Sequence, residues 1–203
     1  MRIKDILSIR PVKWSLVIIG AVIVGIFLGR FITSYETQYL FSREYCGTYK
    51  GIDVYKCGEI DGENARAHLS LLEGAPEPLT DACSALYLTG GSLTVPIVND
   101  ENGKALGLTQ NTTIYISTDT FDIDVLYHEL FHAYDNANGK PSETEEFMKI
   151  AAEEGSFFML TKYPEEVISA EVFASAGAMY LIEPTRLQRG APLLYEYIEN
   201  CLD

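Results

Sequence analysis

Two histidines and a glutamate stand at a spacing that suits zinc chemistry, in the run His128-Glu129-Leu130-Phe131-His132. Residues four apart share one face of an α-helix, so His128 and His132 can offer two imidazoles to a single Zn²⁺. A glutamate beside such a metal can act as a general base, which is the role we predict for Glu129. Asp135 follows three residues after the second histidine and is placed to orient His132 through a hydrogen bond.

The alternative is an amphipathic core helix whose two histidines make ordinary hydrogen bonds. The chain has only three histidines, and two of them are in this motif. A buried glutamate between them needs a metal or another partner, because burying an unpaired carboxylate is unfavourable. These points favour the zinc site. The third histidine, His68, is predicted to be a surface or half-buried residue rather than a ligand.

A catalytic zinc needs a third protein ligand as well as an open position. No further histidine follows closely, so the candidates are carboxylates on the C-terminal side of the motif. They are Glu153, Glu154, Glu165, Glu166 and Glu171. Glu171 is favoured because it lies in a segment rich in small residues, 169–178, which can approach the motif helix closely. Glu154 is the alternative.

Hydrolysis of a peptide also needs a hydrogen-bond donor for the oxyanion that forms on the carbonyl. Tyr163 stands about two helical turns before Glu171 and could supply its phenol, with Pro164 fixing the backbone beside it. Tyr134 and Tyr180 are alternatives, and Tyr163 could instead only cover the start of the helix. We predict Glu129 and Tyr163 as the catalytic residues.

The surrounding segments indicate a mixed α+β domain. The motif helix is predicted to start at Asp122 or Asp124 and to stop at Asn138-Gly139. Further helices are expected at 64–72, 142–160 (with Ser142 and Glu145 as a capping box), 164–182 and 192–202, with 184–190 as a link. Strands are expected at 54–57, 84–89, 105–108 and 113–117.

The strand at 105–108 is expected to lie at an edge of the sheet near the motif helix. An edge strand can hold an extended peptide by adding it to the sheet. Gly107 and Leu108 are the predicted substrate contacts, and Gly107 would let a peptide backbone approach closely because it has no side chain.

The N-terminal part has the composition of a membrane anchor. Residues 14–33 are apolar apart from Arg30 and a few small polar residues, and they reach the length of about 20 residues that spans a bilayer. Four basic residues precede this run, so 1–13 is predicted to be cytoplasmic and 34–203 extracellular. A cleaved signal peptide is the alternative. A row of small residues (Ala21, Gly25, Gly29) could pair two anchors in a dimer.

The rest of the chain is strongly acidic. It carries 28 of the 29 acidic residues but 10 of the 15 basic ones, which gives −18 after Arg30. This charge argues against a nucleic-acid partner. All four cysteines (Cys46, Cys57, Cys83 and Cys201) follow the apolar run, and their spacing does not suit a cysteine zinc site. The simplest disulfide pairing is Cys46–Cys57 and Cys83–Cys201, with a hairpin turning at Lys50-Gly51; free thiols are the alternative.

Three pieces of the sequence resemble the catalytic domain of anthrax toxin lethal factor and the related Pro-Pro endopeptidases. They are HELFHAYD, AEVFASAGAMYL and RLQRGAPLLYEYIEN, which occur in this order within roughly 84–203. The resemblance implies a gluzincin with His128, His132 and Glu171 as zinc ligands and Glu129 as base. It also implies a tyrosine shortly before the glutamate ligand. Tyr163 stands one residue upstream of that place, and Ser175 occupies a position where the family often has a second glutamate.

The expected fold is therefore a zincin-like metallopeptidase domain with a small mixed sheet, an active-site helix and a C-terminal helical part, preceded by one transmembrane helix. We divide the chain into 1–13, 14–33, a stalk and N-terminal part at 34–83, and the peptidase domain at 84–203. The expected function is a membrane-anchored extracellular zinc endopeptidase acting on a protein or peptide. The alternative is an inactive binding module of the same fold that recognises an extracellular protein.

Overall fold

The structure is a computed structural model that describes residues 43–91, 93–94, 104–160 and 167–203. The predicted cytoplasmic segment 1–13 and the predicted anchor 14–33 lie outside the described residues. Among the described helices, none combines the length and the apolar character that crossing a bilayer requires. Residues 43–203 form one compact unit.

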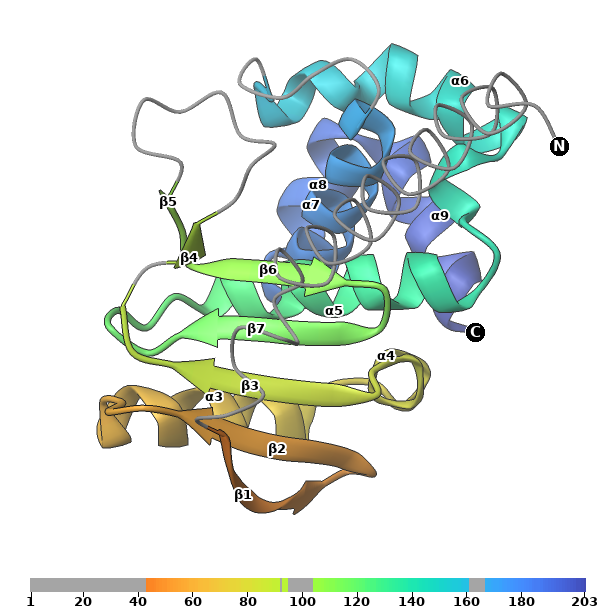
Figure 1. Cartoon of the computed structure of the whole chain (residues 1–203). Coiled ribbons are helices and arrows are strands. Elements are labelled where there is room, and N and C mark those ends of the chain that lie inside the picture. The colour runs from red at the N-terminus through yellow and green to blue at the C-terminus, as the bar shows by residue number, and fades with distance from the viewer. Residues whose placement is uncertain (1–42, 92, 95–103, 161–166) are drawn as a thin grey trace, which may run out of the picture. The chain divides into compact units, whose positions relative to one another are not determined.

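A five-stranded mixed sheet forms one half of this unit (Figure 1). Its strands, in spatial order, are β1 (Arg43–Tyr49), β2 (Ile52–Cys57), β3 (Ala85–Thr89), β7 (Thr113–Ser117) and β6 (Gly107–Gln110). The three central strands are parallel, whereas β1 and β6 pair antiparallel at the two edges. A two-stranded sheet of β4 (Leu93–Thr94) and β5 (Lys104–Ala105) stands beside it. The predicted mixed sheet is confirmed, and so is β6 as an edge strand.

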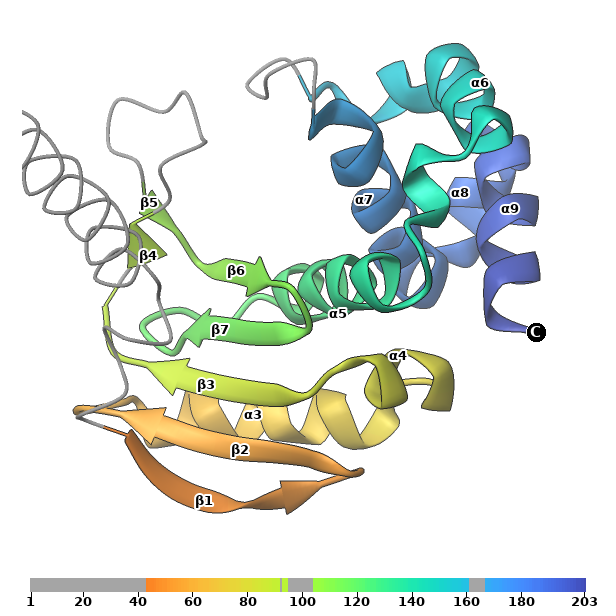
Figure 2. The same cartoon turned by 45° about the vertical axis from the view of Figure 1, so that its right-hand side comes forward.

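Helices cover one face of the sheet and continue into a helical half. Between β2 and β3 the chain forms α3 (Gly62–Gly74) and α4 (Glu77–Ala82), as a parallel crossover requires. The motif helix α5 (Ile123–Ala137) runs along β6 and β7 and lies between the sheet and the C-terminal helices (Figure 2). Those helices are α6 (Glu145–Glu154), α7 (Ile168–Ile182), α8 (Pro184–Gly190) and α9 (Pro192–Leu202), with short 3₁₀ turns η1 (Pro141–Glu143) and η2 (Gly155–Phe158).

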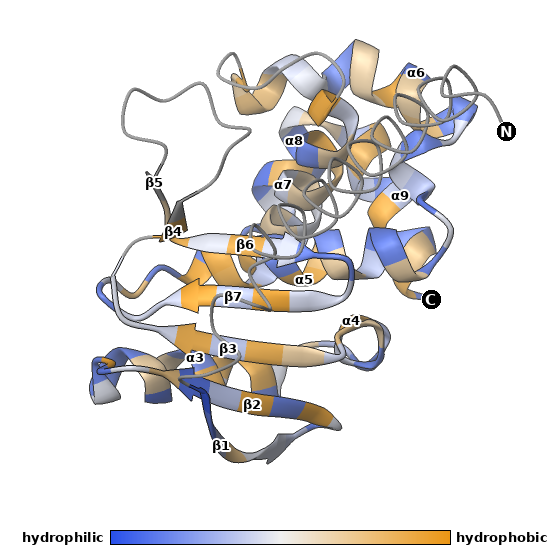
Figure 3. Ribbon diagram, viewed as in Figure 1, coloured by the Kyte–Doolittle hydropathy of each residue, from blue (hydrophilic) through white to orange (hydrophobic). Residues whose placement is uncertain are grey.

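The core lies between the sheet and the helices that cover it, and it continues among the C-terminal helices. Successive strand residues point to opposite faces, so the apolar side chains at alternate positions meet the helices. The resulting orange bands on β2, β3 and β7 can be followed in Figure 3. Six fully buried strand residues belong to the same apolar cluster as Leu72 of α3 and Leu126 and Leu130 of α5: Ile52, Val54, Leu86, Leu88, Ile114 and Ile116. This apolar layer anchors α5 on the sheet.

Several predicted element ends needed correction. Residues 184–190, predicted as a link, form α8, because Pro184 is compatible with the first turn of a helix. Helix α6 begins later than predicted: its N-cap is Thr144, whose hydroxyl accepts a hydrogen bond from the Phe147 amide at 3.2 Å. Ser142, which was predicted to cap this helix, therefore does not cap it. The hairpin turn at Lys50-Gly51 is confirmed, with both residues at positive φ.

The four cysteines are free thiols, so neither predicted disulfide is present. In the hairpin, Cys57 pairs with Arg43, and Cys46 lies in a bulge three residues further along β1. Three strand residues span roughly 10 Å, which exceeds the separation that a disulfide bridges. Cys83 follows α4 and directs its Sγ toward the Ala85 carbonyl, whereas Cys201 is in α9. Burial raises the pKa of the Cys83 thiol to about 12.

Candidate metal centre

The motif helix forms where its local sequence predicts. Asp122 is the N-cap, and its carboxylate accepts a hydrogen bond from the Asp124 amide at 3.0 Å. Asn138 ends the helix, and its backbone amide donates to the Tyr134 carbonyl. Leu126, Leu130 and Phe131 are fully buried, so the helix is fixed by the core on the faces beside the histidines.

His128, His132 and Glu171 come together at one point, as predicted (the cluster is the one group of potential metal ligands found among the described residues). The two Nε2 atoms lie 3.0 Å apart. Glu171 Oε2 lies 3.3 Å from His128 Nε2, and its Oε1 lies 3.4 Å from His132 Nε2. Ligands at 2.0–2.1 Å from a tetrahedral Zn²⁺ are about 3.3 Å from one another, so this triangle fits zinc.

The electrostatics of Glu171 also suit a cation. Burial by itself would raise the pKa of this carboxyl, but the two facing imidazoles outweigh burial and bring the pKa down to about 2. Burial lowers the pKa of His132, and Glu171, Glu129 and Asp135 outweigh it, so that pKa is raised. Within the described residues, the buried Oε2 of Glu171 accepts no well-aligned hydrogen bond. An anionic, unsatisfied oxygen between two imidazole nitrogens is a position that a metal ion would satisfy.

Close packing of α7 on α5 brings Glu171 to the histidines. Gly177 is the contact point, because a Cβ there would overlap the Phe131 ring. Phe131 precedes His132 and is fully buried. Its ring also meets Phe173 edge to face, at 5.9 Å between centroids. The small residues of this segment therefore allow the close approach that the sequence predicted.

Glu129 is held by the edge strand. It is 7% exposed, and its Oε2 accepts a hydrogen bond of 2.7 Å from the Thr109 hydroxyl. Gly107 leaves the space for this carboxylate, since a Cβ there would lie 2.7 Å from both Glu129 Cγ and Oε1. This side of the strand therefore faces α5, and the predicted contact of Gly107 with a substrate backbone stays a prediction.

Sequence reasoning overlooked Thr109. Strand alternation places it on the same face as Gly107, two residues away, and this spacing was the available clue. Leu108 points to the other face, where it pairs with Tyr115 in the register of β6 and β7, and it is half-buried.

Asp135 is 2% exposed and has different hydrogen-bond partners from the one predicted. Its two oxygens accept from the backbone amide and the hydroxyl of Ser142, both at 2.8 Å. These bonds tie the end of α5 to the turn that leads into α6. Its effect on His132 is electrostatic, because it contributes to the raised pKa of that imidazole.

Glu154, the alternative third ligand, is occupied elsewhere. Its carboxylate accepts from the backbone amides of Leu193 and Leu194 at 3.2 and 3.0 Å, so it caps the start of α9. Glu153 is exposed on α6, while Glu165 and Glu166 lie outside the described residues.

Tyr163, the predicted oxyanion donor, also lies outside the described residues. The two alternative tyrosines have other contacts. The Tyr134 hydroxyl donates to the Cys201 carbonyl at 2.6 Å and so joins α5 to α9. Tyr180 packs against Tyr195 with ring centroids 5.0 Å apart. These contacts leave Tyr163 as the candidate from sequence.

His68 is more deeply buried than predicted, at 1% exposure, and it is not part of the ligand cluster. Its ring packs against Phe121, in the segment that leads into α5, at 5.0 Å between centroids. Neither ring nitrogen makes a well-aligned hydrogen bond within the described residues. Burial lowers the pKa of this imidazole, although the Thr120 backbone and the Asp122 carboxylate act in the opposite direction.

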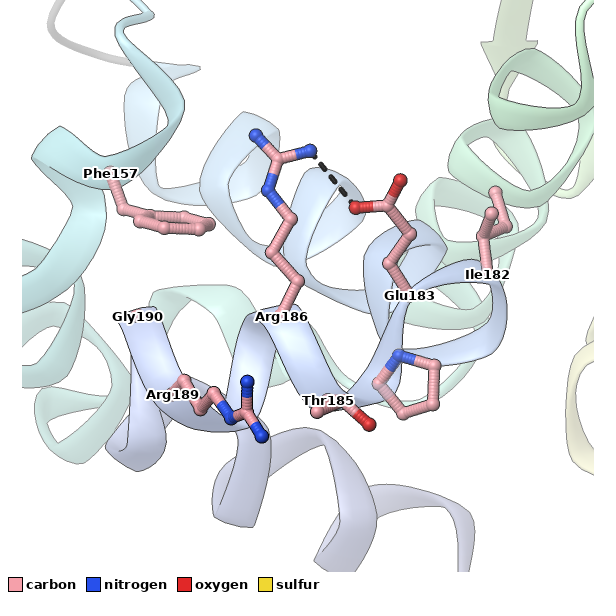
Figure 4. A pocket seen from close by; sticks show the side chains of 8 residues that line it. Phe157, Ile182, Glu183, Thr185, Arg186, Arg189 and Gly190 are labelled. Carbon is pink, nitrogen blue, oxygen red and sulfur yellow. Dashed lines mark hydrogen bonds and ion pairs between the residues drawn. The ribbon is translucent and has the colours of Figure 1, made fainter.

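An open pocket lies at the corner between α7 and α8 (Figure 4). Arg186 reaches across it and forms an ion pair of 2.9 Å with Glu183, while Phe157 lines the opposite wall. Ile182, at its edge, stands eleven residues after Glu171, which is about 16 Å along a helix. The pocket therefore does not include the metal ligands.

Comparisons with known proteins agree with this arrangement. The family described as "Anthrax toxin lethal factor, N- and C-terminal domain" matches residues 95–201, which include all three ligands. Among solved structures, the Pro-Pro endopeptidase PPEP-2 from Paenibacillus alvei is similar with a TM-score of 0.56 and 23% sequence identity, over 72% of this chain and 96% of that chain. Among curated proteins, no sequence matches. Because the family match spans more than half of the sequence and contains the whole ligand set, the chain belongs to the anthrax toxin lethal factor family.

Proposed function

We propose that this protein is a zinc-dependent endopeptidase that hydrolyses peptide bonds of a protein or peptide substrate. The observation that carries this proposal is the triangle of His128, His132 and Glu171 with Glu129 buried beside it. Two imidazoles and one carboxylate are a ligand set of catalytic zinc sites, which keep one position open. The PPEP-2 relative is an endopeptidase, which supports the same reaction type here.

The residues of the chain divide the work between binding and proton transfer. His128, His132 and Glu171 would hold Zn²⁺, which when bound would polarise the substrate carbonyl and make water more acidic. Glu129 would take the proton of the attacking water on a carboxylate oxygen and later deliver it to the leaving amine. Tyr163 would donate a hydrogen bond to the oxyanion.

The edge of the sheet offers a place for the substrate. Within the described residues β6 pairs only with β7, so its outer edge has backbone groups for a further strand. An extended peptide added there would run beside α5, because β6 packs on that helix. We propose that Gly107 and Leu108 contribute backbone contacts to such a peptide.

The test is the variant Glu129→Gln, assayed on a peptide library with purified protein. It should keep stoichiometric zinc and lose cleavage by about 10²–10⁴-fold, the usual contribution of general acid–base catalysis. Glu153→Gln, which changes an exposed glutamate of α6, is the matched control and should cleave normally. Retained cleavage in Glu129→Gln would exclude Glu129 as the base.

The second candidate is a binding module that holds zinc without hydrolysing peptides. The serine at position 175, where the family often has a glutamate, favours this alternative. It predicts that wild-type protein binds one zinc but cleaves no peptide, with or without a chelator. The enzyme is favoured by the ligand set of two histidines and one glutamate, which is typical of catalytic zinc sites, and by the buried glutamate beside it.

The location of the protein stays a prediction from the sequence. We propose a single membrane anchor at 14–33 with the domain outside the cell, supported by the apolar run and the basic residues before it. Pairing of two anchors through Ala21, Gly25 and Gly29 is a further proposal on the same segment.

A further inference from the structure

The edge strand β6 presents two residues to the base of the active site. Gly107 and Thr109 are two apart, so they lie on the same face of the strand, and both contact Glu129 of α5. No other strand residue is hydrogen-bonded to this carboxylate among the described contacts. The position of Glu129 therefore depends on β6 as well as on its own helix.

The hydroxyl of Thr109 has one hydrogen and two acceptors within reach. Its Oγ1 lies 2.7 Å from the Glu129 carboxylate Oε2 and 2.9 Å from the Glu129 carbonyl oxygen. A hydrogen bond from a hydroxyl to a carboxylate is shorter and stronger than one between neutral groups. The distance of 2.7 Å between Thr109 Oγ1 and Glu129 Oε2 agrees with such a charge-assisted bond. Oε2 is thus occupied by Thr109, while Oε1 remains available for another proton.

Gly107 lies against the other carboxylate oxygen of Glu129, Oε1. The position of a Cβ on Gly107 would be 2.7 Å from Glu129 Oε1 and 2.7 Å from Val125 Cγ1. Any side chain would push the carboxylate or the strand away. The absence of a side chain lets Glu129 lie directly against the strand backbone, where Thr109 can reach it.

A general base must lie within hydrogen-bond reach of the proton that it takes, and small displacements weaken it. Glutamate has three rotatable side-chain bonds, so a fixed partner reduces the number of positions its carboxylate samples. Glu129 directly follows the candidate ligand His128 in α5. The Thr109 hydrogen bond therefore acts on a carboxylate that already lies beside the metal ligands.

We propose that Thr109 is a positioning residue for Glu129, and that β6 thereby joins substrate binding at its outer edge to the placement of the base at its inner face. This inference rests on the proposed peptidase function. A strand pairing with β6 would hold Thr109, and through it Glu129, in register with the bound peptide.

The test compares Thr109→Val, which removes the hydroxyl at constant shape, with Thr109→Ser, which keeps it. Thr109→Val should lower kcat by about 10–100-fold, the range for loss of an outer partner in a metal site, with KM and zinc content unchanged. Thr109→Ser should restore kcat. The matched control is Thr89→Val, because Thr89 is a fully buried strand residue whose hydroxyl, among the described contacts, donates to the Ile116 carbonyl.

A normal kcat in Thr109→Val would overturn the proposal, and so would an equal loss of kcat in Thr89→Val. If Thr109→Val does not fold, Thr109→Ala replaces it. Failure of both to fold beside a normal Thr109→Ser would assign the hydroxyl a purely structural role and would also overturn the proposal.

A separate measurement works even if the wild-type protein cleaves nothing, which would refute only the proposed function. Thermal unfolding of metal-free protein is followed for Thr109→Val, Thr89→Val and Glu129→Ala, and for Glu129→Ala combined with each threonine variant. The Tm loss from Thr109→Val should be smaller in the Glu129→Ala background, whereas the loss from Thr89→Val should be the same in both. Additive losses for Thr109 and Glu129 would show that the two side chains are not coupled.

Discussion

The two sides of α5 hold their carboxylates in different ways. On the sheet side, Glu129 accepts a short hydrogen bond from Thr109 of β6. On the helical side, Glu171 reaches the histidines because Gly177 lets α7 pack against Phe131. One carboxylate is fixed by a donor, whereas the other is brought into place by packing and keeps a buried oxygen without a well-aligned donor among the described residues.

The difference corresponds to two chemical roles. A base has to be aimed while one oxygen stays free for a proton, and a single hydrogen bond to the other oxygen does this. A metal ligand has to be held ready without its lone pairs being used, because a competing donor would have to be displaced when the metal binds. We therefore expect substitutions on the α7 side to reduce metal binding more than they reduce the catalytic step, and substitutions on the β6 side to do the reverse.

The largest effect is expected from Glu171→Ala. Removing this ligand should weaken zinc binding by more than about 100-fold, since loss of even an outer partner of a metal ligand costs 10–100-fold. Zinc titration with a competing chelator measures this. Glu154→Ala is the control, and it should keep its zinc because Glu154 caps α9. If the two variants behave the other way round, the assignment of the third ligand is wrong.

A smaller effect is expected from Gly177→Ala. A methyl group at this position would overlap the Phe131 ring, and overpacking of this kind destabilises by about 1–3 kcal/mol. In a domain of this size each kcal/mol lowers Tm by about 2–4 °C. Zinc affinity should fall as well, because α7 has to move away from α5. Both quantities can be measured on the same preparation.

Gly62→Ala is the matched control for that variant. Gly62 begins α3, and a Cβ there would have only the end of the flexible Arg66 side chain nearby, at 3.8 Å. This variant should leave both Tm and zinc affinity close to the wild-type values. Equal behaviour of the two glycine variants would show that close packing at Gly177 does not position Glu171.

The parts of the site that could be predicted from the sequence depend on short spacings between residues or on the composition of a single segment. The i, i+4 histidines and the cap at Asp122 are local patterns, and strand β7 and helix α9 have the predicted ends. Glu171 could be preferred over Glu154 because small residues surround it. These features need no knowledge of which elements become neighbours in space.

Other features depend on tertiary neighbours, so local patterns give at most the face of an element on which a residue lies and not its partner. Thr109 became important only because β6 pairs on the side of β7 that brings it against α5. Asp135 has the right spacing to orient His132, but Ser142 folds back and uses both of its oxygens. The predicted Cys46–Cys57 disulfide failed for the same reason, because sequence spacing does not give strand register, and the predicted Cys83–Cys201 disulfide joins the end of α4 to α9, whose placement the sequence does not give.

The smallest effect concerns the pH dependence of stability on the sheet side. Burial lowers the pKa of His68 from its ordinary value of 6.5. Above about pH 6.5 the ring is neutral in both folded and unfolded protein, so it contributes no pH dependence. Below that pH the unfolded chain takes up a proton that the folded protein resists, and stability is lost as pH falls toward the folded pKa.

The replacement His68→Leu should therefore reduce the fall in Tm between pH 7.5 and pH 5.5, measured on metal-free protein. His132, on the other side, has a raised pKa and changes stability in the opposite direction, since protonation favours the folded state. His132 is present in both the wild type and the His68→Leu variant, so the difference between their falls in Tm reports on His68 alone. The Tm at pH 7.5 gives the packing effect of the replacement alone. An unchanged fall in Tm would mean that the folded protein protonates His68 as readily as the unfolded chain does, and that Asp122 and the Thr120 backbone compensate for its burial.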